Sequence, residues 1–315
     1  MSALDLRSRA QRYIALRHAL GYRPQPTERL VLDFIAFVET HGATDPVTAQ
    51  IAMDWACGPD CESHRNRAAR LSVVRGFLAH VRAAEPQTQV PAVGLLRRPA
   101  RPAPYIFSDE QIAAVLRAAR ALGPIGSLRP HTYATLIGLL ASCGLRIGEA
   151  VNLRLDDVRL QAVPPHLHLA ESKFHKSRIV VLHPTAAAGL QAYVDERRRL
   201  GYHHASDTLF VSEAFGPLRA ASARRTFAEI ARRAGVRPSK GRGAHLHDLR
   251  HTFAVRRLVL WYREGIDVHA RLPELSVYLG HVRPSDTFWY LTATPQLLLS
   301  AATRFEDFAG AGGPS

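Results

Sequence analysis

Residues 244–254 read Ala-His-Leu-His-Asp-Leu-Arg-His-Thr-Phe-Ala, and the interpretation of the whole chain starts from this stretch. His247 precedes Arg250 by three residues, so a helix would place both side chains on one face. The apolar residues that follow, through Val259, have the spacing of a buried helix behind that face. An imidazole and a guanidinium on one face suit an anion whose charge grows during a reaction. The alternative is an ordinary helix surface that happens to carry a His-x-x-Arg pair.

The composition favours a globular protein of two domains with a polyanionic partner. The chain has 315 residues, a hydrophobic content of 47% and a formal net charge of +14. That hydrophobic content allows a sizeable core, and the positive charge favours nucleic acid over a membrane surface as the partner. There are three cysteines, no signal peptide and no long apolar run. These features predict a cytoplasmic protein without disulfides or membrane spans.

Residues 1–90 predict a small helical domain, because four stretches have helical spacing of apolar residues. The fourth, from about residue 62 to 83, carries Arg65, Arg67 and Arg70 near its start. These arginines fit either a solvated basic face or a helix that binds DNA, and the motifs in the second half of the chain favour the DNA-binding helix. In the same region, Cys57-x3-Cys61-x2-His64 offers three metal ligands where a structural zinc site normally has four, so a turn between helices is favoured.

Residues 91–105 are rich in proline and arginine and predict a linker. A plain spacer and a strap that touches phosphate both remain open. Residues 106–315 then predict a second domain that is mainly helical with a small β-sheet, an α+β fold. Ser108 and Gln111 form a capping-box pattern at its first helix. The segment from His131 to Cys143 is apolar nearly all round and therefore predicts a core helix, which Gly144 ends.

Residues 167–182 predict a β-hairpin, because two apolar stretches flank a short basic turn. Further on, Pro273 in a first turn predicts the start of a short helix that Gly280 stops, with His281 just past that stop. Ser285 can cap the following helix, which carries Tyr290. The alternative role for Tyr290 is packing in an aromatic core cluster.

These motifs, taken in order, resemble those of the tyrosine recombinases, the phage-type integrase family. The family pattern is an Arg-x-x-Glu box, a lysine on a β-hairpin, His-x-x-Arg, Leu-Gly-His and a nucleophilic tyrosine about nine residues later. All five occur between about residues 107 and 305. The residues that the resemblance marks as catalytic are Arg146, Lys173, His247, Arg250, His281 and Tyr290.

The resemblance implies further roles for the chain. Glu149 would orient Arg146, while Lys176 and Arg178 of the hairpin would contact DNA beside the arginines of the fourth helix. Residues 1–90 would be a core-binding domain that clamps the duplex together with the catalytic domain. A homo-tetramer on two double-stranded DNA sites would cleave and rejoin strands through a 3′-phosphotyrosine link, with no cofactor and no metal. A last helix, from about residue 294, would dock on its own protomer or on a neighbour.

Two alternatives of different class remain open. A type IB topoisomerase would share the chemistry but relax supercoils without strand exchange, and a non-catalytic basic DNA-binding protein would not need Tyr290. Leu291-Thr292 follows the tyrosine where many family members have a residue and then a histidine. This difference bears on the subfamily and favours an integrase or transposase of a mobile element.

Overall fold

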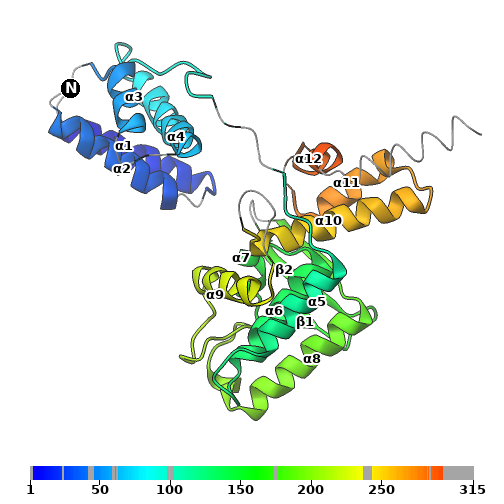
Figure 1. Ribbon diagram of the computed structural model, residues 1–315. Helices are drawn as coiled ribbons and strands as arrows, with labels where there is room; N and C mark the ends of the chain where they lie inside the picture. Colours follow the sequence, from blue (N-terminus) through cyan, green and yellow to red (C-terminus); the bar gives the residue numbers. More distant parts are fainter. Residues whose placement is uncertain are drawn as a thin grey trace, which may run out of the picture. The chain divides into compact units, whose positions relative to one another are not determined.

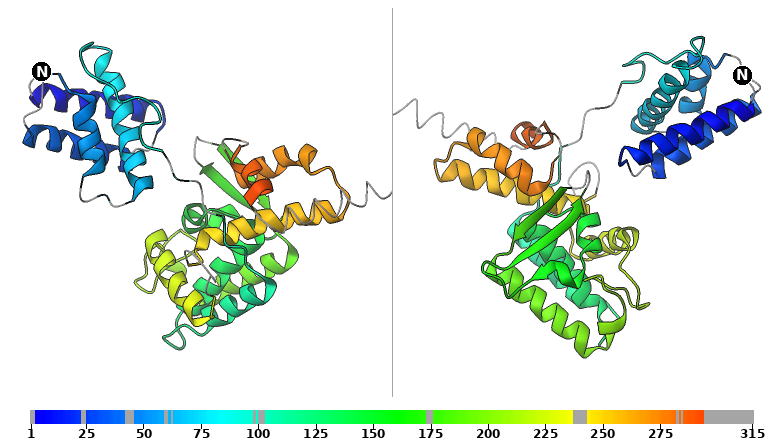
Figure 2. Two further views of the ribbon diagram at one scale, coloured as in Figure 1. Left: turned by 45° about the horizontal axis from the view of Figure 1, so that its top comes forward. Right: turned by 180° about the vertical axis from the view of Figure 1, so that it is seen from behind.

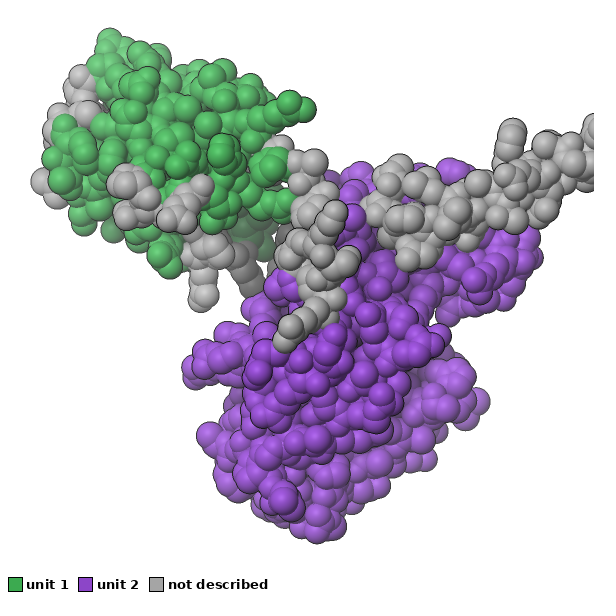
Figure 3. Space-filling model, in the orientation of Figure 1, with its two compact units in different colours: residues 1–102 green, residues 103–315 purple. Residues whose placement is uncertain are grey.

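The computed structural model describes residues 3–22, 25–41, 46–58, 61, 63–97, 99, 103–172, 176–236, 243–281, 283 and 285–293. The chain forms two compact units, residues 1–102 and 103–315, which are coloured separately in Figure 3. The division falls inside the segment predicted as a linker. Each unit has its own hydrophobic core.

Unit 1, residues 1–102, is helical in its described part (Figure 1). Its helices are α1 (Ala3–Ala19), α2 (Gln25–Thr40), α3 (Ala49–Cys57) and α4 (His64–Arg82). The Thr48 side chain caps α3 by accepting from the backbone N–H of Ile51 at 3.3 Å. Apolar side chains of all four helices share one core, in which Phe34 meets Trp55 edge to face.

Unit 2, residues 103–315, is mainly helical with a small sheet, which confirms the predicted fold class. Its helices are α5 (Asp109–Arg120), α6 (Arg129–Cys143), α7 (Ile147–Asn152), α8 (Pro184–Arg199), α9 (Ala220–Arg233), α10 (Leu246–Arg263), α11 (Val268–Leu279) and α12 (Ser285–Ala293), with short 3-10 turns η1 (Leu155–Asp157) and η2 (Tyr202–His204). α6 packs against α5, α8 and α10, so its apolar surface is buried on several sides as predicted.

The sheet has the order β1-β2-β3 and is antiparallel throughout (Figure 2). Its strands are β1 (Val158–Arg159), β2 (His166–Ser172) and β3 (Lys176–Val181), and β2 with β3 forms the predicted hairpin. Leu167 and Leu169 of β2 are buried, and their partners on β3 are Val180 and Arg178. Because side chains alternate along a strand, Arg178 lies on the buried face of the sheet.

α10 takes part in two hydrophobic clusters of unit 2. Leu246 and Leu249 belong to the larger cluster, which α6 also lines, whereas Ala254 and Leu258 belong to a smaller one shared with α11 and Tyr290 of α12. Between these two sets of apolar residues, the side chains of residues 250–252 are polar and buried. The helix that carries the His-x-x-Arg motif therefore contributes side chains to both clusters.

The predicted start of α11 at Pro273 is wrong, because the helix begins five residues earlier. Asp267 caps it by accepting from the backbone N–H groups of His269 and Ala270 at 2.9 and 3.2 Å. Pro273 lies inside the helix, where it cannot donate a backbone hydrogen bond. Packing of Val268 and Leu272 in the smaller cluster outweighs this loss.

Arg197, near the end of α8, anchors the loop that follows. Its side chain is 1% exposed. The guanidinium donates hydrogen bonds to four carbonyl oxygens of that loop, those of Tyr202, Ser206, Thr208 and Leu209. The Leu209 N–H in turn donates to the Leu153 carbonyl oxygen at 2.7 Å, just after α7. Arg197 thus holds the loop whose backbone is hydrogen-bonded to Leu153, the residue that follows α7.

We expect Arg197→Leu to lower the free energy of unfolding by about 3 kcal/mol, because it leaves several buried carbonyl oxygens unpaired. Arg199→Leu is the matched control on the same helix, since the Arg199 side chain is exposed and its guanidinium pairs with Glu196. Urea unfolding of both variants measures the difference. Equal stability of the two variants would contradict the anchoring role of Arg197.

Candidate active site

Arg250 is a buried cation whose partners are backbone carbonyl groups. Its side chain is 1% exposed, and its guanidinium donates to the carbonyl oxygens of Gly144 at 2.7 Å and Leu279 at 2.6 Å. These oxygens lie at the C-terminal ends of α6 and α11, where helix carbonyls carry partial negative charge. Burial, followed by the charge of Arg146, lowers the pKa of Arg250 to about 10. The guanidinium therefore stays charged at neutral pH.

Glu149 of α7 holds two further arginines. Its carboxylate accepts from the Arg146 side chain at 2.7 Å and backbone N–H at 2.9 Å, and from the Arg178 side chain at 2.8 Å. Burial alone would raise the pKa of Glu149, but hydrogen bonds and charge from Arg178, and then from Arg146, lower it to about 2. Arg146 also donates to the Gly280 carbonyl oxygen. Its side chain remains 30% exposed, so part of this guanidinium faces solvent.

The helix ends at Gly144 and Gly280 fix this arrangement. Both glycines have left-handed backbone conformations, with φ of 62° and 67°. A Cβ at Gly144 would lie 2.5 Å from the Phe253 ring, and one at Gly280 would lie 2.6 Å from the Arg178 guanidinium. Each of these positions therefore requires glycine for two reasons, the left-handed backbone conformation and the close approach of a neighbouring side chain.

The tyrosine and histidine side chains of the motifs lie beside one another. The Tyr290 ring stacks near that of His281, with centroids 6.3 Å apart, and His281 Nδ1 is 2.7 Å from the Thr287 hydroxyl. Tyr290 is 1% exposed. His247 is exposed, on the face of α10 that also carries Arg250.

One contact was not expected from the sequence. His251 Nδ1 is 2.8 Å from the Tyr290 hydroxyl oxygen, and the His251 side chain is buried. The His247 ring lies against that of His251, with centroids 4.5 Å apart. The only sequence signal for His251 was its position one helical turn after His247, on the same face of the helix.

The structure brings together five of the six residues expected to be catalytic: Arg146, His247, Arg250, His281 and Tyr290. Lys173 lies outside the described residues, as does the side chain of Lys176. Arg178, expected to contact DNA, directs its guanidinium inward to Glu149 and to the Tyr278 carbonyl oxygen. Its contact with DNA stays a prediction.

The arginines of α4 differ from one another in their surroundings. Arg65 is exposed, Arg67 donates to the Cys61 carbonyl oxygen at 2.6 Å, and the Arg70 guanidinium lies 4.2 Å from the Trp55 ring centroid. Arg67 and Arg70 are therefore partly engaged within unit 1. The role of all three in DNA binding stays a prediction.

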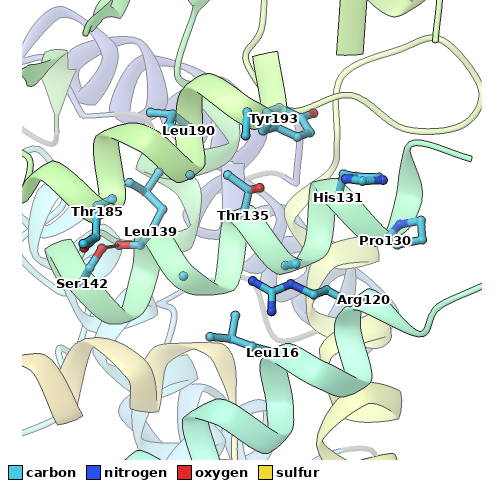
Figure 4. Close-up of a pocket in the computed structure, with 15 residues that line it drawn as sticks. Leu116, Arg120, Pro130, His131, Thr135, Leu139, Ser142, Thr185, Leu190 and Tyr193 are labelled. Carbon is cyan, nitrogen blue, oxygen red and sulfur yellow. Dashed lines mark hydrogen bonds between the residues drawn. The ribbon is translucent and has the colours of Figure 1, made fainter. Parts of the chain in front are cut away.

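A cavity of about 610 Å³ lies apart from these residues, between α5, α6 and α8. Figure 4 shows Thr135 and Leu139 of α6 and Leu190 of α8 lining it, and none of the expected catalytic residues does so. Within the described ranges, no cluster of three or more His, Cys, Asp or Glu side chains could hold a metal ion, and no helix is long and apolar enough to cross a membrane.

Comparison with known proteins places this arrangement in a family. Residues 107–296, more than half of the chain, match the model of the phage integrase family. The chain belongs to the phage integrase family. The members of this family are enzymes that transfer DNA strands, and membership supports site-specific DNA recombination as the activity.

Relatives of this phage integrase family member cover nearly its whole length. It is 41% identical over 307 residues to the provisionally named integrase/recombinase y4rB of Sinorhizobium fredii, covering 95% of this chain and 96% of the relative. It is 30% identical to the tyrosine recombinase XerD of Mycobacterium leprae, covering 90% and 86%.

Solved structures share the fold at lower identity. The Tn1549 transposon integrase, determined with transposon right end DNA, has a TM-score of 0.65 at 15% identity and covers 96% of this chain and 99% of that one. The XerH recombinase, determined after cleavage of its difH substrate, has a TM-score of 0.63 at 18% identity and covers 97% and 85%. These similarities agree with the helical fold and small sheet described above.

We expect Gly280→Ala to reduce stability more than Gly265→Ala does. Both glycines are left-handed, with φ of 67° and 72°, but a Cβ at Gly265 meets nothing within 4 Å. The shared conformational cost is about 1 kcal/mol, and displacement of Arg178 should add about 2 kcal/mol in Gly280→Ala. Urea unfolding compares the two variants. Equal losses would mean that the close approach to Arg178 is not needed for stability.

The low pKa of Glu149 predicts a specific acid sensitivity. A carboxylate with a lowered folded-state pKa stabilises the fold above its unfolded pKa of about 4.3, and this stability is lost as pH falls toward 2. We expect Glu149→Gln to be about 3 kcal/mol less stable at pH 7 and to lose less stability between pH 4.5 and about 2. Urea unfolding across this range measures both effects. Glu274→Gln serves as the control, because Glu274 is exposed. If the free energy of unfolding of Glu149→Gln fell with decreasing pH as steeply as that of wild type, the role of the carboxylate would be contradicted.

Proposed function

We propose that this chain is a site-specific DNA recombinase that cleaves and rejoins strands through a 3′-phosphotyrosine intermediate. The observation that carries the proposal is the convergence of Arg146, Arg250, His281 and Tyr290 from four separate segments. Two guanidinium groups beside a tyrosine hydroxyl form a site for a phosphodiester and its attacking oxygen.

In the proposed reaction, the Tyr290 oxygen attacks the scissile phosphorus. The bond between this oxygen and phosphorus forms as the bond from phosphorus to the 5′ oxygen breaks. Arg146 and Arg250 bind the non-bridging oxygens, whose negative charge increases in the pentacoordinate transition state. His281 donates to a phosphate oxygen, and Lys173 protonates the departing 5′ oxygen. The reverse reaction rejoins the strand, and the link keeps the energy of the original bond.

Glu149 is proposed to orient the arginines. Its carboxylate accepts hydrogen bonds from the backbone N–H and the guanidinium of Arg146, and it also accepts one from the Arg178 guanidinium. This pairing limits the positions that the Arg146 guanidinium can take while leaving part of it exposed. Such preorganised charge costs little reorganisation when the transition state forms.

The proposed partner is double-stranded DNA, bound by both units. The net charge of +14 and the arginines of α4 support binding to the phosphate backbone. A homo-tetramer on two sites is proposed, because two exchanging duplexes require four strand cleavages. A λ integrase tetramer on a Holliday junction shares this fold, with a TM-score of 0.60 at 16% identity, covering 89% of this chain and 78% of that one. A mobile element is the proposed biological setting, in integration, excision or transposition.

We expect the wild-type protein to form a covalent complex with nicked DNA in the presence of EDTA, and Tyr290→Phe to form none. The substrate is a pool of nicked duplexes with randomised sequence, from which covalently bound members are recovered after denaturation. The nick lets the short 5′ fragment leave, so the protein stays attached. The enriched duplex then serves as the defined substrate for each variant on a denaturing gel.

Tyr278→Phe is the matched control, because Tyr278 is a nearby, partly buried tyrosine that stacks on Phe253. Burial, and next the proximity of Cys143, raises the pKa of Tyr278 above its ordinary value, which makes it a poor nucleophile. Tyr278→Phe should keep the covalent complex. No enriched duplex with wild type, or a complex that survives Tyr290→Phe, would reject the proposal. Supercoil relaxation by the same tyrosine without any strand exchange would instead indicate a type IB topoisomerase.

A further inference from the structure

We propose that His251 is the group that accepts the Tyr290 proton during strand cleavage and returns it during joining. This inference rests on the recombinase function proposed above and names the acceptor of the tyrosine proton, which the proposed reaction does not assign. The deciding observation is the 2.8 Å distance between His251 Nδ1 and the Tyr290 hydroxyl oxygen.

Burial gives this contact a direction. Tyr290 is 1% exposed and His251 is 3% exposed. A phenol is protonated at neutral pH, since its ordinary pKa is about 10, and a buried hydroxyl donor needs an acceptor. A neutral imidazole has one acceptor nitrogen and one donor nitrogen. We therefore assign Nδ1 as the acceptor of the tyrosine O–H, with the imidazole proton on Nε2.

The two histidines of α10 then have different positions and roles. His247 and His251 are one helical turn apart on the same face, and their rings are in contact. His247 is exposed, so it lies where a DNA phosphate can reach it, whereas His251 is buried against the nucleophile. The Trp289 ring of α12 lies near the His251 ring, and His281, after α11, lies near the Tyr290 ring. Arg250 of α10 is close enough to feel the charge of Tyr290 when it ionises. His247 is thus left to hydrogen-bond the phosphate.

The proton transfers balance across the reaction. On cleavage, the Tyr290 O–H bond breaks and its proton moves to His251 Nδ1, while the tyrosine oxygen bonds to phosphorus. The 5′ oxygen leaves with a proton from Lys173. The imidazole is then an imidazolium and the Lys173 amine is neutral. On joining, the 5′ hydroxyl returns its proton to Lys173 as its oxygen bonds to phosphorus, and the imidazolium returns its proton to the tyrosine oxygen as the phosphotyrosine bond breaks. Neither direction consumes a co-reactant.

The test compares His251→Ala and His251→Asn with wild type on the enriched nicked duplex, in single-turnover cleavage. Asparagine can place an amide oxygen near the position of Nδ1 and accept a hydrogen bond, but it cannot take up a proton. Loss of a general base should slow cleavage about 100-fold in both variants. DNA binding, measured by gel shift, should remain. Thermal unfolding is compared with that of Tyr290→Phe, which removes the same hydrogen bond.

A more acidic nucleophile gives a readout that a structural role would not affect. Trifluorotyrosine at position 290 loses its proton more readily and depends less on a base. It should therefore restore cleavage by His251→Ala at least about tenfold, with a smaller effect on wild type. His247→Ala is the matched control one turn away, and fluorination should not restore its activity because its role is at the phosphate.

The outcomes separate this inference from the proposed function. If His251→Ala or His251→Asn cleaved at the wild-type rate, the role of His251 would be overturned while the proposed function stood. A defect in His251→Ala that trifluorotyrosine does not relieve would have the same meaning. Relief in His247→Ala but not in His251→Ala would assign the base to His247. Absence of any Tyr290-dependent covalent complex would reject both proposals together.

Discussion

The burial of the Arg250 guanidinium between two hydrophobic clusters is the constraint on which unit 2 depends. α10 contributes Leu249 to the larger cluster and Ala254 to the smaller one, which leaves the Arg250 side chain 1% exposed. A buried charge without partners costs several kcal/mol, so the guanidinium must be satisfied inside the protein. Its partners are the last carbonyl groups of α6 and α11. These two helices must therefore keep fixed positions against α10 for the charge to be tolerated.

The same constraint sets the positions of the other motif residues. Arg146 follows the Gly144 carbonyl by two residues, and His281 comes two residues after Leu279, so the two helix ends that satisfy Arg250 also deliver these side chains. Arg146, Arg178 and Arg250 against Glu149 give three positive charges and one negative, a net charge of +2 in the cluster. In the proposed reaction a phosphodiester gains negative charge as it becomes pentacoordinate, so this positive charge would stabilise the transition state more than the ground state.

Local signals predicted much of this arrangement and failed where tertiary packing decides. Gly144 and Gly280 marked helix ends because only glycine takes the left-handed conformation easily, and the alternation around residues 167–182 marked the hairpin. The start of α11 was misplaced because a proline is typical of a first turn, whereas packing of Val268 extends the helix before it. The inward direction of Arg178 and the contact of His251 with Tyr290 join residues 29 and 39 positions apart. No spacing rule reports contacts at such separations.

The two hydrophobic clusters also divide the site into two parts. Arg146 and Arg250 are tied to the ends of α6 and α11, and α6 is packed on several sides by the larger cluster. Tyr290 belongs to the smaller cluster, through α12, which packs on α10 and α11. Attack on a phosphate requires the buried tyrosine oxygen to become accessible. In the proposed reaction, a movement of α12 that uncovers this oxygen would cost contacts in the smaller cluster, and it must keep the Tyr290 hydroxyl within reach of His251. Arg146 and Arg250 would keep their carbonyl partners during such a movement.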